Sequence, residues 1–203
     1  MMPFLLGNEN KVLNQTNVCI LDYGSGNVKS VYNLISFLGY NVKVSNEIDD
    51  IKTATHIILP GVGAFGSAMK KINLKIPLVD LANEVIQNKK PFLGICVGMQ
   101  VLVEKGYEYG EHDGLGWLPG FVNKIETNTY PSLHIGWNNI NVKTDSILFQ
   151  GLDDINDFYF VHSYHVKCNQ QSDVLTSTDY GNNFVSSFIR DNIVGVQFHP
   201  EKS

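Results

Sequence analysis

The sequence predicts an α/β fold, with a mostly parallel central sheet flanked by helices and an antiparallel extension. Its first half alternates continuous apolar strands with helical segments, which is typical of a parallel sheet covered on both faces. From about residue 116 onward, short strands dominate instead. The sequence has no internal repeat, low-complexity tract or linker. We therefore expect one domain over residues 17–203, preceded by a poorly ordered, asparagine-rich leader at residues 1–16.

The first half supplies the elements of the parallel sheet. Val31, Leu34, Ile35 and Leu38 would share one face of a helix that Gly39 ends. Strands are expected at residues 18–22, 41–45, 56–59 and 92–95, and helices at about 27–38, 78–88 and 96–104.

The second half predicts the antiparallel extension, which is either appended to the same sheet or packed beside it. Its strands are expected at residues 121–125, 138–142, 158–161, 164–168, 174–178, 184–189 and 193–198. The last of them leads directly into His199, and the chain ends three residues after Pro200.

The composition indicates a soluble, cytoplasmic protein. The chain has 203 residues, of which 43% are hydrophobic and 17% charged. Its net charge of −5, without a cluster of Lys or Arg, does not support nucleic acid or a membrane as a partner. No apolar run is long enough to span a bilayer, and the N-terminus lacks the pattern of a signal peptide. Cys19, Cys96 and Cys168 are an odd number without a CxxC pair, which favours reduced thiols over a disulfide or zinc site.

Cys96 has the setting of a nucleophile. It lies in GICVG, between an apolar strand and a predicted helix. This pattern is typical of a nucleophile elbow, a sharp turn that lifts one side chain out of the sheet edge. The N-terminus of the following helix favours a thiolate. A free cysteine is otherwise usually a buried core residue, which is how we interpret Cys19 and Cys168.

The end of the chain supplies the partners that such a nucleophile needs. His199 and Glu201 are two residues apart after an apolar strand, so both can lie on one side of the chain. Together with Cys96 they provide a nucleophile, a base and a carboxylate that orients the base. These are the three parts of cysteine acyl-transfer chemistry.

The glycine-rich segment PGVGAFG, residues 60–66, follows a strand. It is either an oxyanion loop or a tight turn. As an oxyanion loop it would supply one backbone N–H from Val62 or Gly63, and Val97 would supply the other. The same letters match a phosphate loop, but that motif's lysine is absent and we do not favour nucleotide binding.

Two further polar positions are ambiguous. Gln100, one helical turn after Cys96, either hydrogen-bonds a substrate through its amide or faces solvent. His162 and His165 could pair as metal ligands, but strand geometry would place them on opposite faces. No Glu or Cys is spaced to complete a metal site, so we expect none and interpret the pair as a polar strand end beside the cleft.

These motifs resemble the class I (triad) glutamine amidotransferases, and within them the glutaminase subunits of imidazole glycerol phosphate synthase. The resemblance covers about residues 17–203 and includes ILDYGSGNVKSV, ILPGVGAFGSAM, PFLGICVGMQVL, EYGEHDGLGWLPG, HIGWN, YFVHSYHV and GVQFHPEKS. It implies hydrolysis of L-glutamine to L-glutamate and ammonia. It also implies a heterodimer with a cyclase-type synthase subunit, and no cofactor.

The resemblance assigns roles to individual residues. It implies a catalytic triad of Cys96, His199 and Glu201. It implies that the glutamine pocket is formed by Gly63, Gln100, Glu108, Ser163 and Tyr164. It also implies a partner-facing edge that includes Asn27, Trp137 and Lys202.

Other functions stay open at this point. The family normally adds a terminal helix after the histidine motif, and we expect it to be missing here. A paralogous glutaminase subunit that supplies ammonia for amidino groups on surface sugars would carry the same site. A Cys-His peptidase of similar fold, or a catalytically weak interaction subunit, would be of another class.

Overall fold

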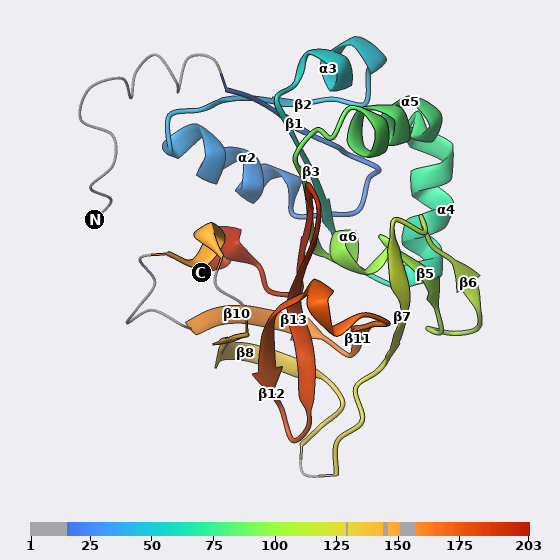
Figure 1. Ribbon diagram of the computed structural model, residues 1–203, viewed down its shortest axis with the longest axis vertical. Coiled ribbons are helices and arrows are strands. Elements are labelled where there is room, and N and C mark those ends of the chain that lie inside the picture. Colours follow the sequence, from blue (N-terminus) through green and yellow to red (C-terminus); the bar gives the residue numbers. More distant parts are fainter. Residues whose placement is uncertain (1–15, 129, 144–145, 151–156) are drawn as a thin grey trace.

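The computed structural model describes residues 16–128, 130–143, 146–150 and 157–203 (Figure 1). Except for Thr16, the predicted leader at residues 1–16 lies outside the described residues.

The central sheet confirms the predicted fold class. Its strands lie in the order β2-β1-β3-β4-β14-β13-β12-β9, and it is parallel from β2 to β14 and antiparallel from β14 to β9. The antiparallel extension therefore joins the same sheet. The strands are β1 (Asn17–Ile20), β2 (Asn41–Val44), β3 (His56–Gly61), β4 (Phe92–Cys96), β9 (Asn141–Val142), β12 (Val174–Asp179), β13 (Asn183–Arg190) and β14 (Ile193–Val196).

Two smaller sheets stand beside the central one. One pairs β8 (His134–Asn139) with β10 (Asp157–His162), and the pairing is antiparallel. The other has the order β11-β7-β5-β6. Its strands are β5 (Val103–Gly106), β6 (His112–Asp113), β7 (Leu118–Lys124) and β11 (Tyr164–Cys168). Part of the predicted extension is thus packed beside the main sheet.

Helices cover both faces of the parallel strands, with α2 on one side and α4 and α5 on the other (Figure 1). The helical elements are α2 (Val28–Phe37), α3 (Ile48–Thr53), α4 (Phe65–Lys75), α5 (Leu78–Ala82), a π-helical turn η1 (Asn83–Gln87), α6 (Val97–Gln100) and the 3-10 turns η2 (Ile147–Phe149), η3 (Gln171–Asp173) and η4 (Pro200–Lys202).

Two helices were not predicted. They are α3 and α4. Helix α4 begins within the glycine-rich segment at residues 60–66, which the sequence analysis treats only as a loop. The periodicity of α4 was nevertheless in the sequence, because Phe65, Ala68, Met69 and Ile72 recur on one buried face.

The predicted helix from Cys96 to about residue 104 is wrong in its length. α6 ends at Gln100, and Val103 already belongs to β5, which pairs in parallel with β7. Leu102 and Val103 are fully buried. Tertiary pairing with β7 therefore overrides the local helix pattern and turns the chain after a single helical turn.

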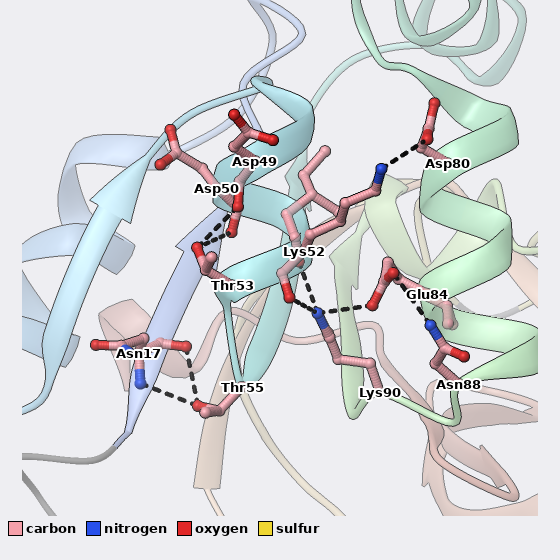
Figure 2. A network of polar contacts seen from close by, with 12 residues as sticks. Asn17, Asp49, Asp50, Lys52, Thr53, Thr55, Asp80, Glu84, Asn88 and Lys90 are labelled. Atoms are coloured by element: carbon pink, nitrogen blue, oxygen red, sulfur yellow. Dashed lines mark hydrogen bonds and ion pairs between the residues drawn. The ribbon is translucent and has the colours of Figure 1, made fainter.

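Lys90, just before β4, ties the helical layer to the sheet (Figure 2). Its ammonium lies 2.9 Å from the Glu84 carboxylate and donates hydrogen bonds to the carbonyls of Ile51 and Lys52, in the last turn of α3. Both charged side chains are nearly buried. The hydrogen bond from Lys90 is the main reason that the pKa of Glu84 is lowered. This cluster fixes α3 and η1 against the strand that delivers Cys96.

Candidate functional site

Cys96 sits at a strained turn between β4 and α6. Its backbone has φ 54° and ψ −113°, a conformation that residues other than glycine rarely adopt. The flanking glycines make the turn possible. A Cβ on Gly98 would overlap the carbonyl oxygen of Leu59, and a Cβ on Gly94 would lie 2.5 Å from the carbonyl oxygen of Gly98. Strain of this kind persists where the surrounding structure imposes it, and it is concentrated at functional sites.

The strand order brings the other groups to the same sheet edge. β4 lies between β3 and β14, with Gly61 paired to Cys96 and Val196 paired to Ile95. All three strands are parallel, so the segments that follow them leave at one edge. The glycine-rich loop, Cys96 and His199 meet there although they are far apart in the chain.

His199 and Glu201 are joined by a hydrogen bond of 2.8 Å between Nδ1 and Oε1, and both side chains are buried. The carboxylate accepts, so Nδ1 carries the proton and Nε2 is the basic nitrogen of the neutral ring. Asn27 donates a second hydrogen bond, of 3.0 Å, to the same Oε1.

Further contacts hold this turn against β10. The His199 backbone N–H donates to the Tyr159 carbonyl at 2.9 Å, and the Ser203 hydroxyl donates to the His199 carbonyl at 2.8 Å.

The pair is electrostatically coupled. Burial alone would lower the pKa of His199, but Cys96 and Glu201 outweigh it and raise that pKa to about 9. Burial alone would raise the pKa of Glu201, but the hydrogen bond and charge of His199 lower it overall. Among the described residues His199 Nε2 has no hydrogen-bond partner. With a pKa of about 9, the ring holds a proton on Nε2 near pH 7, beside the Cys96 sulfur that helps to raise this pKa.

A cavity of about 280 Å³ opens above Cys96. This is a volume suited to a small metabolite. Its wall contains the positions predicted for the substrate, the oxyanion and the nucleophile: Val62, Gly63, Cys96, Val97, Gln100, Glu108, Ser163, Tyr164 and His199, joined by Val161 and His162. Glu201 does not line it and lies behind His199.

The solvent-facing alternative for Gln100 is wrong. This side chain is 2% exposed, and its Nε2 donates hydrogen bonds to the Tyr164 carbonyl at 2.9 Å and to Gln197 Oε1 at 3.0 Å. Both amide hydrogens are thereby used within the protein. Only the amide oxygen of Gln100 remains to meet a ligand in the cavity.

Glu108 reaches the cavity from the loop after β5. Its Oε2 accepts the backbone N–H of Phe65 at 2.8 Å, at the N-terminus of α4. A carboxylate is favoured there because the orphan N–H groups of a helix start carry partial positive charge. This contact fixes the carboxylate in the cavity wall, where it can receive a cationic ligand group.

The glycine-rich loop borders the cavity through Val62 and Gly63. Gly63 has φ 98°, which only glycine adopts without strain, and Val62 is 42% exposed. Beneath the loop the Tyr23 hydroxyl is buried against Gly61, and it has no hydrogen-bond partner within the described part of the chain. Apart from its place in DYGSGN, nothing in the sequence pattern distinguishes this tyrosine.

The most extended feature that sequence reasoning missed is a buried line of polar groups. His162 Nδ1 lies 2.9 Å from the Tyr164 carbonyl, His162 Nε2 lies 3.0 Å from His134 Nδ1, and Asn138 Nδ2 lies 3.2 Å from His134 Nε2. The interpretation as a polar strand end beside the cleft holds for His162, which ends β10 and lines the cavity. His165 lies on the separate strand β11, and both rings pack against Phe184.

The residues predicted for a partner-facing edge divide into two groups. Trp137 is 59% exposed and meets the Tyr159 ring edge-on at 6.2 Å, while the Lys202 ammonium lies over that ring at 5.3 Å. These three form one surface at β8, β10 and η4. The Asn27 side chain instead points to Glu201.

Within the residues that the structure describes, no cluster of three or more His, Cys, Asp or Glu side chains could hold a metal ion. None of the helices in that part of the chain is long and apolar enough to cross a membrane.

Comparison with known proteins agrees with this geometry. The family model of glutamine amidotransferase class-I matches residues 19–203. The chain is 42% identical to imidazole glycerol phosphate synthase subunit HisH of Pelagibacter ubique, over 92% of this chain and 93% of that protein. It is 48% identical to the subunit of the same name from Aquifex aeolicus, over 91% of this chain and 88% of that protein.

Solved structures share the fold at low identity. A glutamine amidotransferase from Thermotoga maritima has a TM-score of 0.67 and 17% identity, covering 93% of this chain and 77% of that one. The structure of PurLQS from the same organism has a TM-score of 0.70 and 18% identity, with 92% and 88% covered.

Proposed function

The chain belongs to the class I glutamine amidotransferase family, and we propose that it is the glutaminase subunit of an imidazole glycerol phosphate synthase. It would hydrolyse L-glutamine to L-glutamate and ammonia and pass the ammonia to a cyclase-type synthase subunit. The observation that carries the proposal is the meeting of Cys96 and the His199–Glu201 pair at one cavity. The identity with relatives named for this synthase supports the choice of acceptor.

The reaction would start with the Cys96 proton already transferred to His199 Nε2, as a thiolate–imidazolium pair, in line with the raised pKa of His199. Glu201 supports this transfer because its carboxylate keeps the other ring nitrogen protonated and stabilises the imidazolium. The Cys96 sulfur then forms a bond to the side-chain amide carbon of glutamine, and the carbonyl oxygen takes up the negative charge. Backbone N–H groups of Val97 and of Val62 or Gly63 would stabilise that oxyanion, each worth about 3 kcal/mol.

His199 would next return its proton to the amide nitrogen. The carbon–nitrogen bond breaks, ammonia leaves, and a thioester to Cys96 remains. A water molecule then loses a proton to His199 and attacks the thioester carbon. Cleavage of the carbon–sulfur bond releases glutamate, and the proton returns to the sulfur. These reaction steps use only side chains and backbone groups of this chain, together with water.

The cavity wall suggests how glutamine is oriented. The Glu108 carboxylate would receive the α-ammonium group, since it is the acidic side chain in the wall. The backbone at Ser163 and Tyr164 would bind the α-carboxylate, and the Gln100 oxygen is available to an N–H donor of the ligand. Trp137 and Lys202, with their exposed ring and ammonium, would contact the synthase subunit.

The test is to measure glutamate release by the purified chain alone and with the cyclase-type subunit and the ligand of that subunit. In the family that this chain resembles, the partner turns one backbone N–H of the glycine-rich loop toward the oxyanion. We therefore expect the partner to raise kcat by at least about 100-fold, because one missing oxyanion donor costs that much. A glutamine-containing peptide should remain uncleaved, and Cys96→Ala is the blank. Peptide cleavage without glutamate release from free glutamine would contradict the proposal. Full activity of the isolated chain would contradict a partner-dependent oxyanion site.

A further inference from the structure

Gln197, the residue after β14, is a buried amide beside the nucleophile. It is 0% exposed, and its Nε2 lies 3.6 Å from the Cys96 sulfur, within hydrogen-bond distance for sulfur. The amide thus donates to the sulfur from the end of β14, in addition to the interaction of that sulfur with His199. Neither the triad nor the proposed glutamine pocket uses Gln197.

The orientation of this amide is determined by its neighbours. The Tyr164 carbonyl can only accept, so the group that Gln100 directs toward it at 2.9 Å must be the NH₂ group. The second hydrogen of the same NH₂ reaches Gln197 Oε1 at 3.0 Å. Rotating the Gln197 amide by half a turn would place two NH₂ groups face to face. The NH₂ of Gln197 therefore points at Cys96.

The line of histidines supports the same direction of donation. The Tyr164 carbonyl fixes the proton of His162 on Nδ1, so its Nε2 accepts from His134 Nδ1. His134 Nε2 then accepts from the Asn138 amide. Burial lowers the pKa of His134 to about 4 and of His162 to about 3, so both rings stay neutral near pH 7. The Tyr164 carbonyl is thus held by two donors, and Gln100 with it.

We propose that the Gln197 amide donates a hydrogen bond that stabilises the Cys96 thiolate, with its orientation set by the Tyr164 carbonyl through Gln100. The inference rests on the proposed role of Cys96 as the nucleophile. A hydrogen bond to an ionised acceptor is roughly twice as strong as one to a neutral acceptor. The amide therefore favours the thiolate over the thiol, both before attack and when the thioester breaks.

The experiment follows the alkylation of Cys96 by iodoacetamide as a function of pH, with mass spectrometry to identify the modified cysteine. Burial raises the pKa of Cys19 to about 11 and of Cys168 to about 12, so these thiols react little below pH 9. The titratable groups around Cys96 are His199 and Glu201 after β14, Tyr23 after β1, His162 at the end of β10, Tyr164 at the start of β11 and Glu108 after β5. None of these groups is altered in the variants below.

Two variants of similar length test the amide. Gln197→Met removes the donor, and we expect the pH midpoint of alkylation to rise by about one unit, equivalent to ~10-fold slower alkylation below the midpoint. Gln197→Glu places a carboxylate against the sulfur, so its midpoint should rise further. Thr176→Val is the control, because it removes a buried hydroxyl that bonds Ser186 and Ser187 in the same sheet, away from Cys96. Its midpoint should not move.

The outcome separates this inference from the proposed function. An unchanged midpoint in a folded Gln197→Met or Gln197→Glu protein would overturn the role of Gln197, even if glutaminase activity is present. If the two variants shift the alkylation midpoint but the wild-type chain never releases glutamate, the proposed function is wrong and the contact between Gln197 and the thiolate is still supported. In the Gln197→Met protein, kcat for glutamate release should be lower than in the wild type, with little change in KM, because the Gln197 amide does not face the substrate.

Discussion

Asn27 and Glu201 are joined by a hydrogen bond of 3.0 Å although 174 positions separate them in the chain. Asn27 immediately precedes α2, after β1, and Glu201 lies in η4, after β14. The same Glu201 oxygen also accepts from His199. The orientation of the proposed base therefore depends on a side chain from the N-terminal part of the chain.

This relationship predicts the effect of removing either partner. Asn27→Ala should lower kcat for glutamate release by about 10-fold, the scale of one hydrogen bond to a charged group, with KM little changed. Glu201→Gln should lower kcat by up to ~10⁴-fold, because it also removes the charge that favours the imidazolium. Asn182→Ala, which loses only an exposed bond to the Glu126 carbonyl, is the matched control and should be unaffected. Equal rates for Asn27→Ala and Asn182→Ala would contradict the prediction.

The second prediction concerns the three cysteines. Cys96→Ala should abolish glutamate release and leave the thermal unfolding midpoint close to that of the wild type, since a small side chain suits this tight turn. Cys168→Ala should retain activity, because that half-buried thiol lies away from the cavity. Steady-state glutamate assays and circular dichroism make the comparison. Activity that survives in Cys96→Ala but not in Cys168→Ala would refute the assignment of the nucleophile.

Gly98 and Gly63 should respond differently to an added methyl group. Gly98→Ala would drive a Cβ into the Leu59 carbonyl, which is backbone and cannot move aside, so we expect a loss of several kcal/mol or no folding. Gly63→Ala meets open space, and its cost is the left-handed backbone, about 1–2 kcal/mol. Urea unfolding measures both values. Equal destabilisation by the two changes would show that the close approach at Gly98 is not required.

A fourth prediction concerns stability below neutral pH. Burial lowers the pKa of His134 to about 4 and of His162 to about 3, from an ordinary 6.5. The unfolded rings take up protons below pH 6.5 while the folded rings do not. The stability that the folded protein keeps by holding these two rings neutral is therefore fully present above pH 6.5. It is lost as the pH falls toward 4. Each ring contributes a slope of up to ~1.4 kcal/mol per pH unit in that window.

The measurement is the free energy of unfolding in urea at pH 7, 6 and 5. His134→Phe should reduce the slope, because the new ring would pack against Phe160, Tyr180 and Phe184 without a titrating group. Its stability at pH 7 should also fall, since His162 loses a donor. The same free energy at pH 7 and pH 5 in the wild type would show that these rings are protonated in the folded state.

Features with local causes could be predicted from the amino-acid sequence alone. The elbow follows from a cysteine between two glycines at the end of an apolar strand, and the His199–Glu201 pair follows from a spacing of two residues. The parallel and antiparallel halves follow from strand periodicity. The helix Phe65–Lys75 could also have been predicted, since its apolar positions recur with helical period.

The contacts that join distant segments depend instead on how the strands are ordered in the folded chain. α6 stops at Gln100 because β5 pairs with β7, and Gln100 uses both its amide hydrogens because Tyr164 and Gln197 lie beside it. The same holds for Asn27 on Glu201 and for the Gln197 amide at Cys96. Each of these contacts depends on β4 lying directly beside β14, or on a loop crossing the same sheet edge. The residues next to a side chain in the sequence do not indicate which distant donor or acceptor will contact it, because the strand order determines that contact.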